Sequence, residues 1–503
     1  MAIALHLPLD REAAEPLYRQ IAGALRERMV RGELAVGERL PPVRSLALAL
    51  GVTPETAAAA YKELERAGAV TARVGRGTFV AAAAALAPPA RDAPLPLPFS
   101  AAGASTDYAD SPQHVLFEDI LRLASQAGMV AFMGGVPAPN LLPVEQVRRA
   151  IDRVLRRDGA AALQYDAPEG YLPLRRTVAR FLEQEGIDAD PDGMLITSGV
   201  MQGIDLVAKV FVGPGDSVVT ESPTYLPSIG AFQTRGAKIL PVPLDGEGMD
   251  LLALERLLVR HRPKLIYTMP SFQNPTGQAM PVEKRLQLLV IAQRYDIPVL
   301  EDDYCSLLHY TKRPPVALKA LDRSGHVIYL ASVSKVISPG LRLGYLLAAP
   351  SLLPRLKVAK YQSDMHTPSL VQRAVDLLLR HPETSAHLDR LRAEYKRRRD
   401  AILAAMERYF PTGVSWTRPD GGFHLWVKVP PHVPVMSLFF EATRRGVAFA
   451  PGQVFFPGEM TENGLRLSFS ATDVAAIDKG IPVLGELLAG YIARPPQVTA
   501  PGT

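Results

Sequence analysis

The sequence predicts two folded parts, a small, mostly helical N-terminal segment and a larger α/β domain. In the N-terminal segment, apolar residues recur at helical spacing between glycines and prolines. The larger part contains short apolar runs that end in polar or charged residues, as strands of an open α/β sheet do where ligands bind. An Ala- and Pro-rich stretch separates the two parts, and 503 residues exceed the usual length of one domain.

Three helices are predicted within the N-terminal segment. Residues 16–31 repeat apolar side chains at helical spacing and stop at a glycine. The second helix is predicted within residues 40–50, which begin with Leu-Pro-Pro and are followed by Gly51. Glycine favours the left-handed conformation that often ends a helix. The third helix begins at Pro54, because Thr53 is a suitable N-cap and proline fits the first helical position.

A β-hairpin is predicted after the third helix. Residues 70–74 and 78–80 have the composition of short strands, and Gly75-Arg76-Gly77 joins them as a turn. Three short helices followed by a hairpin have the order of a winged helix-turn-helix domain, which binds DNA. A helical cap on the larger domain is the alternative that this pattern leaves open.

The composition limits the possible classes of protein. The net charge of +5 is too small to indicate nucleic-acid binding by itself, and a single cysteine, Cys305, argues against a disulfide framework and fits a reducing cytoplasm. No uncharged apolar run approaches the roughly 20 residues of a membrane helix, and an acid at Asp10 is unlike a signal peptide. We expect a cytoplasmic protein without a metal site, in which residues 494–503 form a loose tail.

The most informative segment follows the apolar run 326–331. It contains Ser332, Ser334 and Lys335, with Arg342 seven residues after the lysine. Burial lowers the pKa of a lysine and frees its amine to form a Schiff base. Neighbouring hydroxyls and an arginine are suited to bind a phosphate. The pattern indicates a site for pyridoxal 5'-phosphate (PLP), although a polar surface loop has the same local composition.

Two further strands lead to residues that this cofactor needs. Residues 297–300 are apolar and precede Asp302 and Tyr304, of which the acid would keep the pyridine nitrogen protonated and the tyrosine could reach the phenolic oxygen. Residues 267–270 lead to an Asn-Pro-Thr-Gly turn, in which Asn274 is a second candidate donor to that oxygen. A solvated acidic loop and an ordinary turn are the alternatives for these segments taken alone.

In order and spacing, these residues resemble the signature of the fold-type I, aspartate aminotransferase-like PLP enzymes. The resemblance extends from near His114 to near Ile492 and implies an α/β fold with large and small subdomains. It implies that Lys335 binds the aldehyde carbon and Asp302 the pyridine nitrogen. The other implied ligands are Asn274 and Tyr304 for the phenolic oxygen, Ser332, Ser334 and Arg342 for the phosphate, Tyr225 stacked on the ring, Arg466 for a substrate carboxylate, and Tyr165, which reaches the phosphate from the partner subunit of a homodimer.

Some of these residues have simpler interpretations when they are taken alone. Tyr225 and Tyr165 would fit ordinary core or interface packing, and Arg466 would fit a surface ion pair. The sequence also departs from the family after Gly199, where a hydroxyl residue and a glutamine are common and this chain has Val200 and Met201. Backbone N–H groups at a helix N-terminus still bind phosphate, so we expect these two residues to contribute main-chain donors.

The N-terminal segment resembles the GntR family of DNA-binding domains in residues 37–47, 50–53, 60–61, 64–65, 68 and 75–80. The resemblance implies contacts with double-stranded DNA. The start of the third helix lacks the arginines that this family usually carries, because Pro54 and Ala58 occupy their positions. The remaining candidates for DNA contacts are Arg44, Thr53, Thr56, Arg76 and Gly77.

A GntR-type domain at residues 1–80, a linker at 81–113 and an aminotransferase-like domain at 114–493 resemble the MocR subfamily of bacterial transcription regulators. The resemblance predicts a regulator that senses a small amine, an amino acid or PLP itself. An effector amine would displace Lys335 from the cofactor while Arg466 engages a carboxylate. An active aminotransferase with a vestigial DNA-binding domain is the main alternative, and a constitutive DNA-binding protein that keeps PLP for structure is a third.

Overall fold

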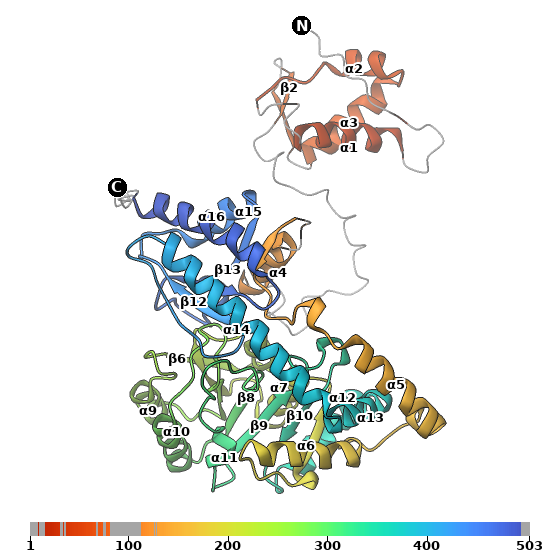
Figure 1. Ribbon diagram of the computed structural model, residues 1–503. Coiled ribbons are helices and arrows are strands. Elements are labelled where there is room, and N and C mark those ends of the chain that lie inside the picture. The colour runs from red at the N-terminus through yellow and green to blue at the C-terminus, as the bar shows by residue number, and fades with distance from the viewer. Residues whose placement is uncertain are drawn as a thin grey trace. The chain divides into compact units, whose positions relative to one another are not determined.

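The structure, a computed structural model, describes residues 9, 16–30, 34, 37–66, 69–73, 77–80, 112–124, 126 and 128–493 (Figure 1). Its internal contacts divide the chain into an N-terminal unit, Met1–Ala104, and a C-terminal unit, Ser105–Thr503. No helix within the described residues is long and apolar enough to cross a membrane.

The three predicted helices of the N-terminal unit are present as α1 (Leu17–Val30), α2 (Val43–Leu50) and α3 (Pro54–Arg66). α2 ends at Gly51, which adopts the left-handed conformation with φ of 62°. The hydroxyl of Thr53 accepts the backbone N–H of Thr56 at 3.3 Å and so caps the first turn of α3. The helix boundaries therefore follow from local capping chemistry.

The helices and the hairpin of this unit share one apolar core. Ile21 of α1 and Leu64 of α3 are fully buried in it, together with residues of α2 and the hairpin. β1 (Val70–Arg73) pairs antiparallel with β2 (Gly77–Val80), while residues 74–76 lie outside the described part of the chain. This is a winged helix-turn-helix fold with a core of its own, so the alternative of a helical cap on the larger domain is wrong.

The large subdomain of the C-terminal unit is built on a sheet of β4 (Met194–Thr197), β5 (Ser217–Ser222), β6 (Lys238–Pro243), β7 (Leu265–Thr268), β8 (Val299–Asp303), β9 (Val327–Ser332) and β10 (Gly344–Leu347). The strand order is β4-β10-β9-β8-β7-β5-β6. β10 runs antiparallel to both of its neighbours, and the pairs from β9 to β6 are parallel. The parallel strands end at one edge of the sheet, where ligands bind in such folds.

Helices cover both faces of this sheet, because side chains along each strand alternate between the faces. On β9, Leu330 packs with one helix layer, and Tyr329 and Ala331 pack with the other. The first layer consists of α7 (Val200–Phe211), α8 (Leu226–Gln233) and α12 (Leu353–Asp364). The opposite layer consists of α5 (Val144–Asp158), α6 (Leu172–Gln184), α9 (Leu251–Arg260), α10 (Val282–Tyr295), α11 (Leu318–Leu321) and α13 (Ser369–Arg380).

The small subdomain contains a second sheet, formed by β3 (Val130–Phe132), β11 (Ser415–Trp416), β12 (His424–Lys428), β13 (Val447–Pro451) and β14 (Gly464–Ser468). Its order is β11-β12-β14-β13-β3, with β3 parallel to β13 and the other pairs antiparallel. Segments from before and after the large subdomain thus meet in one sheet. The helices packed with it are α4 (Pro112–Ala124), α15 (Val435–Arg444) and α16 (Val474–Ile492).

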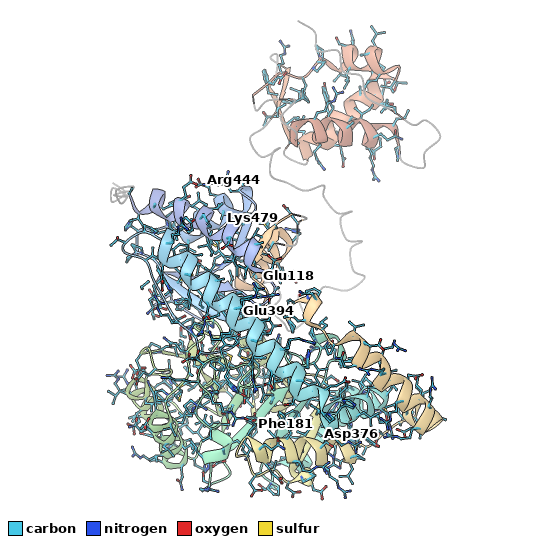
Figure 2. The ribbon with its side chains drawn as sticks, viewed as in Figure 1. Glu118, Phe181, Asp376, Glu394, Arg444 and Lys479 are labelled. Carbon is cyan, nitrogen blue, oxygen red and sulfur yellow. The ribbon has the colours of Figure 1, made fainter. Side chains whose placement is uncertain are left out.

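A long helix, α14 (Glu383–Tyr409), runs from the large subdomain to the small one (Figure 1). Glu394 lies on this helix (Figure 2) and accepts a hydrogen bond from Arg398 at 2.8 Å. Arg398 is 1% exposed and also donates to the carbonyl of Ser470. Arg399 donates to the carbonyl of Pro419 at 2.8 Å. These buried arginines fix loops of the small subdomain against the helix.

We predict that Leu64→Ala destabilises the N-terminal unit by about 2–5 kcal/mol, because it leaves a cavity in a small apolar core. Urea unfolding followed by circular dichroism measures the loss. Leu48→Ala is the matched control, since Leu48 is 87% exposed in the same unit and its truncation removes little buried surface. Equal unfolding midpoints for the two variants would contradict the assignment of this core.

Candidate functional site

A cavity of about 270 Å³ lies at the carboxyl ends of β7, β8 and β9, bordered by α4 and by β12 and β14 of the small subdomain. Every expected cofactor and substrate residue except Tyr165 lines it. The structure thereby brings together side chains from seven segments that are distant in the sequence, namely Val200 and Met201, Tyr225, Asn274, Asp302 and Tyr304, Ser332, Ser334 and Lys335, Arg342, and Arg466.

Asp302 lies deep in this cavity, in β8, and is 2% exposed. Its Oδ2 accepts the hydroxyl of Tyr267 at 2.7 Å, and Tyr267 in turn accepts the hydroxyl of Ser228 at 2.8 Å. Its Oδ1 has no hydrogen-bond partner among the described residues. Burial raises the pKa of Asp302 to about 7. A buried carboxyl group with one oxygen left over is suited to a protonated nitrogen of a ligand.

The two acids beside Asp302 have different partners, because successive residues of a strand face opposite sides. Glu301 accepts two backbone N–H groups at the start of α11, at 2.8 and 2.9 Å. Asp303 accepts the hydroxyl of Tyr329 at 2.7 Å. All three acids are buried in β8, so the alternative of a solvated acidic loop is wrong.

Lys335 follows β9 and its Nζ donates to the carbonyl of Gly135 at 2.7 Å. Burial lowers the pKa of Lys335, and the nearby cations of Arg342 and Arg466 lower it further. Its hydrogen-bond partner is a neutral carbonyl rather than a carboxylate. The amine is therefore more often deprotonated than an exposed lysine, which is the state that reacts as a nucleophile.

Arg466 lies in β14 and is 7% exposed, so the alternative of a surface ion pair is wrong. It donates to Oδ1 of Asn274 at 2.8 Å and to the carbonyl of Met133, and its guanidinium carbon lies 4.8 Å from the centre of the Phe455 ring. Its Nε has no partner among the described residues. Burial lowers the pKa of Arg466 to about 10, and the cation remains charged near neutral pH.

Asn274 is positioned by a turn that a second buried acid supports. Glu221 accepts a hydroxyl and a backbone N–H at the end of β7, and it accepts the side-chain amide of Gln273 at 3.1 Å. Gly277 ends the turn with φ of 71°, and any side chain there would collide with the carbonyl of His424. Burial raises the pKa of Glu221 to about 6. The turn is thus tied both to the sheet and to β12.

One end of the cavity is suited to an anion. Ser332 donates to the carbonyl of Leu343 at 3.2 Å and accepts the backbone N–H of Ser334 at 3.0 Å, while the Ser334 hydroxyl has no partner among the described residues. Arg342 lies against Gly199, the N-cap of α7, where an added side chain would meet its guanidinium. Hydroxyls, an arginine and a helix N-terminus converge here.

Val200 and Met201 begin α7 at this end, as the sequence predicts for main-chain donors. Both side chains are apolar and line the cavity. Gln202 does not replace the missing polar groups, because it accepts the backbone N–H of Ser198 and donates to Asp364, each at 2.7 Å. The side chains with donors available to an anion at this end are those of Ser334 and Arg342.

The three predicted tyrosines differ in position. Tyr304 lines the cavity, and its hydroxyl donates to the carbonyl of Phe272 at 2.8 Å. Tyr225 lines the cavity at the N-cap of α8. Tyr165 is 77% exposed and touches the ring of His366 at 5.7 Å between centroids, so it stays outside the cavity of its own subunit.

Sequence reasoning missed several residues that line the cavity, including His424, Phe117 and Leu121. His424, in β12, is 1% exposed, and burial together with Arg466 and Lys335 holds its pKa well below the usual value. Its Nδ1 has no partner among the described residues. Phe117 and Leu121 come from α4. Helical spacing in residues 112–124 could have indicated the last two, whereas a histidine within an apolar strand is usually a core residue.

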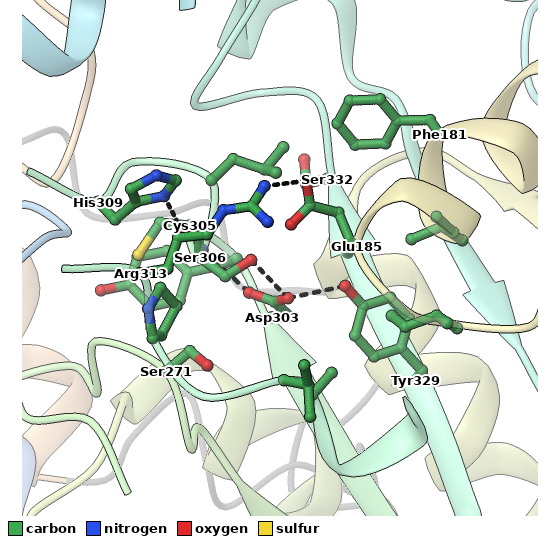
Figure 3. A pocket seen from close by; sticks show the side chains of 18 of the residues that line it. Phe181, Glu185, Ser271, Asp303, Cys305, Ser306, His309, Arg313, Tyr329 and Ser332 are labelled. Atoms are coloured by element: carbon green, nitrogen blue, oxygen red, sulfur yellow. Dashed lines mark hydrogen bonds and ion pairs between the residues drawn. The ribbon is translucent and has the colours of Figure 1, made fainter. Parts of the chain in front are cut away.

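A smaller cavity of about 90 Å³ lies on the face of the sheet that Asp303 occupies (Figure 3). Asp303 is held there by Tyr329, and Arg313 pairs with Glu185 at 2.9 Å. Cys305 also borders this cavity; it is 3% exposed and burial raises its pKa well above the usual value. Cys305 is therefore an unreactive buried thiol.

The predicted DNA-contact residues lie in the N-terminal unit. Arg44 is exposed on α2. Thr53 and Thr56 hydrogen-bond to each other at 3.0 Å at the start of α3, so part of their bonding capacity serves the helix cap. Gly77 begins β2 with φ of 109°. Arg76 lies outside the described residues.

The cavity combines four chemical features. It offers an amine with a lowered pKa, a buried acid with an unused oxygen, an anion-binding end and a buried arginine. These suit a ligand that carries a carbonyl or amine, a basic ring nitrogen and anionic groups at two separate ends.

Known families match both units of the chain. Residues 123–484 match the sequence family "Aminotransferase class I and II", and residues 17–80 match the family "Bacterial regulatory proteins, gntR family". The chain is 42% identical to 2-aminoadipate transaminase of Thermus thermophilus, over 75% of this chain and 94% of that protein. It is 32% identical to the HTH-type transcriptional regulator TauR of Rhodobacter capsulatus, over 94% of this chain and 96% of that protein.

Solved structures match the C-terminal unit. The crystal structure of LysN, the alpha-aminoadipate aminotransferase of Thermus thermophilus in complex with N-(5'-phosphopyridoxyl)-L-leucine, superposes with a TM-score of 0.72 at 40% identity. The match covers 78% of this chain and all of that chain. The shared fold extends over both subdomains.

We predict that stability falls between pH 5 and pH 8 in part because of Glu221. Its pKa is raised from 4.5 to about 6, so the folded state binds this proton more tightly than the unfolded chain does. The resulting stability is complete below about pH 4.5 and is lost as pH rises through 6. The rise in pKa from 4.5 to about 6 corresponds to about 2 kcal/mol in total, of which about 1 kcal/mol is lost between pH 5 and pH 8.

Urea unfolding at pH 5 and pH 8 measures this effect. The compared quantity is the difference in the free energy of unfolding between pH 5 and pH 8. Glu221→Gln should make this difference smaller than in the wild type, even if the substitution also changes stability at both pH values. The exposed Glu118→Gln is the control and should leave the loss unchanged. A fall of equal size in the wild type and in Glu221→Gln would show that the buried proton is not on this residue.

Proposed function

We propose that this protein regulates transcription in response to a small amine, an amino acid or PLP. The chain belongs to the class I and II aminotransferase family and, with its GntR domain, to the MocR-type HTH transcriptional regulators. The observation that carries this proposal is the extent of the match. Relatives named as HTH-type regulators align over 94–95% of the chain, through both units, whereas the named transaminases align over 74–75%.

The residues that line the cavity fit PLP, the cofactor of this family. Within the described part of the chain, Oδ1 of Asp302 and Oγ of Ser334 are buried without hydrogen-bond partners, and they are suited to bind a pyridine nitrogen and a phosphate. Asn274 and Tyr304 would serve the phenolic oxygen. Ser332, Ser334, Arg342 and the main-chain N–H groups of Val200 and Met201 would hold the phosphate, Tyr225 would stack on the ring, and Lys335 would bond the aldehyde.

When bound, PLP supplies an aldehyde that bonds amines and a ring that stabilises negative charge. The chain's own groups define what reaches it. Lys335 presents an amine whose pKa burial lowers, and once free this amine can accept a proton from a bound ligand. Asp302 holds a proton at the ring nitrogen through its charge. Arg466 binds a carboxylate as a fork, and its bond to Asn274 links carboxylate binding to the cofactor.

The position of α4 supports coupling between the cavity and DNA binding. α4 begins at Pro112 and is the first described helix after β2, which ends at Val80 and completes the winged helix-turn-helix fold. Phe117 and Leu121 of α4 line the cavity. A ligand there touches the helix that leads, along the chain, to the DNA-binding unit. Bound ligand can therefore bias how that unit is presented to DNA.

A homodimer would complete the site. Leu163 and Tyr165, at η4 (Gly159–Leu163) and just after it, are 69% and 77% exposed. Val358, Tyr361 and Met365 on or just after α12 are 64%, 50% and 41% exposed, and the contact of Tyr165 with His366 brings the two segments together. Such an apolar surface supports burial against a second copy, whose Tyr165 would reach the phosphate end.

DNA binding would use few phosphate contacts, since the start of α3 carries Pro54 and Ala58 where related domains have arginines. Arg44 is exposed on α2, and Arg39 is exposed beside Gly77 of the wing. A dimer presents two such units, so the spacing of two half-sites would supply much of the specificity. Because bacterial promoter DNA lies in the cytoplasm and the N-terminal unit matches a family of bacterial regulatory proteins, we place the protein in the cytoplasm.

Aminotransferase activity is a second candidate function, because the cavity contains a complete set of proton-transfer and carboxylate-binding groups. The 42% identity to 2-aminoadipate transaminase favours it as well. The two functions differ in what a bound amino acid does. A regulator retains the ligand and changes its DNA affinity, whereas an enzyme converts the ligand into a 2-oxo acid and turns over.

We predict that Lys335→Ala abolishes covalent retention of PLP. The proteins are reduced with borohydride, denatured and analysed by mass spectrometry. The cofactor should remain attached to the wild-type protein and should be absent from the variant. Among the described residues, Lys335 is the one lysine that lines the cavity. Lys360→Ala is a control, since Lys360 is buried and paired with Asp364 outside the cavity. A covalent adduct on the Lys335→Ala protein would refute the assignment.

We predict that Arg44→Ala weakens binding to the protein's own promoter region by about 1–3 kcal/mol if Arg44 makes a bidentate contact to a base. Fluorescence anisotropy at several salt concentrations measures the affinity, and we expect a shallow salt dependence for each monomer. Arg323→Ala, which changes an exposed arginine of the C-terminal unit, should have no effect. If wild-type protein binds the promoter no better than random DNA at low salt, the regulator proposal fails.

A further inference from the structure

Helix α4 presents apolar side chains on two different faces. Ile120 is 1% exposed and belongs to the core of the small subdomain, and Leu123 and Ala124 pack against the same core. Phe117 and Leu121, four residues apart, border the cavity and form a second face, although Phe117 also packs against the core of the small subdomain. The first face anchors the helix, so the second face is held at the cavity rather than being free to turn away.

The charged groups of the cavity already have ligands under the proposed function. Arg342 serves the phosphate, Asp302 the ring nitrogen, Lys335 the aldehyde and Arg466 the effector carboxylate. The wall that α4 provides is apolar, since it consists of Phe117 and Leu121, and the apolar residues Val136, Leu226 and Pro227 line the same cavity. His424 borders the same cavity, but burial lowers its pKa, Arg466 and Lys335 lower it further, and the uncharged form is favoured.

We propose that Phe117 and Leu121 of α4 bind the side chain of the effector and that the effector is an α-amino acid with an uncharged, apolar side chain. The inference rests on the proposed function, since it assigns the amine and carboxylate to Lys335 and Arg466. A charged side chain would lose its hydration against this wall and gain no partner from it. An apolar side chain would instead remove apolar surface from water on both molecules.

A pair of amino acids with equal chain length tests this inference directly. Norleucine and 2-aminoadipate differ at the end of the side chain, where one carries a methyl group and the other a carboxylate. Full-length protein loaded with PLP is titrated with each, and with lysine, and the change in cofactor absorbance gives the half-saturating concentration. We expect norleucine to act at a concentration at least about ten-fold lower than either charged amino acid, in line with typical discrimination by apolar pockets.

Two substitutions on α4 test whether Leu121 and Phe117 determine the preference for norleucine. Leu121→Arg places a cation on the cavity wall at a residue that is 45% exposed, so the helix should still fold. This variant should lose much of its preference for norleucine and gain affinity for 2-aminoadipate. Phe117→Ala should weaken norleucine about ten-fold and leave alanine unchanged, because alanine is too short to reach the ring. Glu118→Gln, on the exposed side of α4, is the control and should match the wild type (Figure 2).

The outcomes separate this inference from the proposed function. If 2-aminoadipate or lysine acts at least as well as norleucine on wild-type protein, or if Leu121→Arg leaves the preference unchanged, the inference about α4 is wrong while amino-acid sensing stands. If no amino acid or amine changes the absorbance of PLP-loaded protein that still binds its promoter, amino-acid sensing fails and this inference fails with it.

Discussion

The site depends on buried charges that do not pair with one another. Asp302, Lys335 and Arg466 line one cavity, yet each is hydrogen-bonded to a neutral group, namely a tyrosine hydroxyl, a backbone carbonyl and an asparagine amide. Charges buried without counter-charges are costly. A ligand that brings a protonated nitrogen, an aldehyde and a carboxylate supplies the missing partners, so binding relieves a cost that the folded protein carries.

The scaffold keeps these groups apart. Adjacent parallel strands β7, β8 and β9 end at one edge of the large sheet and bring the Asn274 turn, Asp302 and Ser332 to the same cavity. Arg466 comes from β14 of the other subdomain. Gly277 lets the Asn274 turn approach the backbone of His424 closely, which joins the two subdomains at the cavity. Movement of one subdomain against the other would therefore change the arrangement of the buried charges.

The elements that carry strong local signals could be predicted from the sequence. The caps at Gly51 and Thr53 and the glycine-flanked hairpin depend on nearby residues alone. The strand ends near Asn274, Asp302 and Lys335 could be recognised because polar residues follow apolar runs, and the family resemblance assigned a role to each.

Features that depend on packing between distant segments could not be predicted in this way. Glu301, Asp302 and Asp303 are consecutive, but only the strand geometry shows that their carboxyl groups have three separate environments. His424 is within an apolar strand, and nothing nearby in the sequence indicates the burial and the two cations that together lower its pKa. Phe117 belongs to the cavity because Ile120 anchors its helix on the small subdomain.

The central claim is that ligand binding at the buried charges controls DNA binding, and one measurement tests it most directly. Promoter affinity of PLP-loaded protein is determined by fluorescence anisotropy with and without an amino acid that changes the cofactor absorbance, while 2-oxo acid production is followed in the same samples. We predict that the amino acid changes the dissociation constant at least about five-fold, as typical coupling free energies allow, with no sustained 2-oxo acid production. Unchanged promoter affinity with steady 2-oxo acid production would contradict this account and identify the protein as a working aminotransferase.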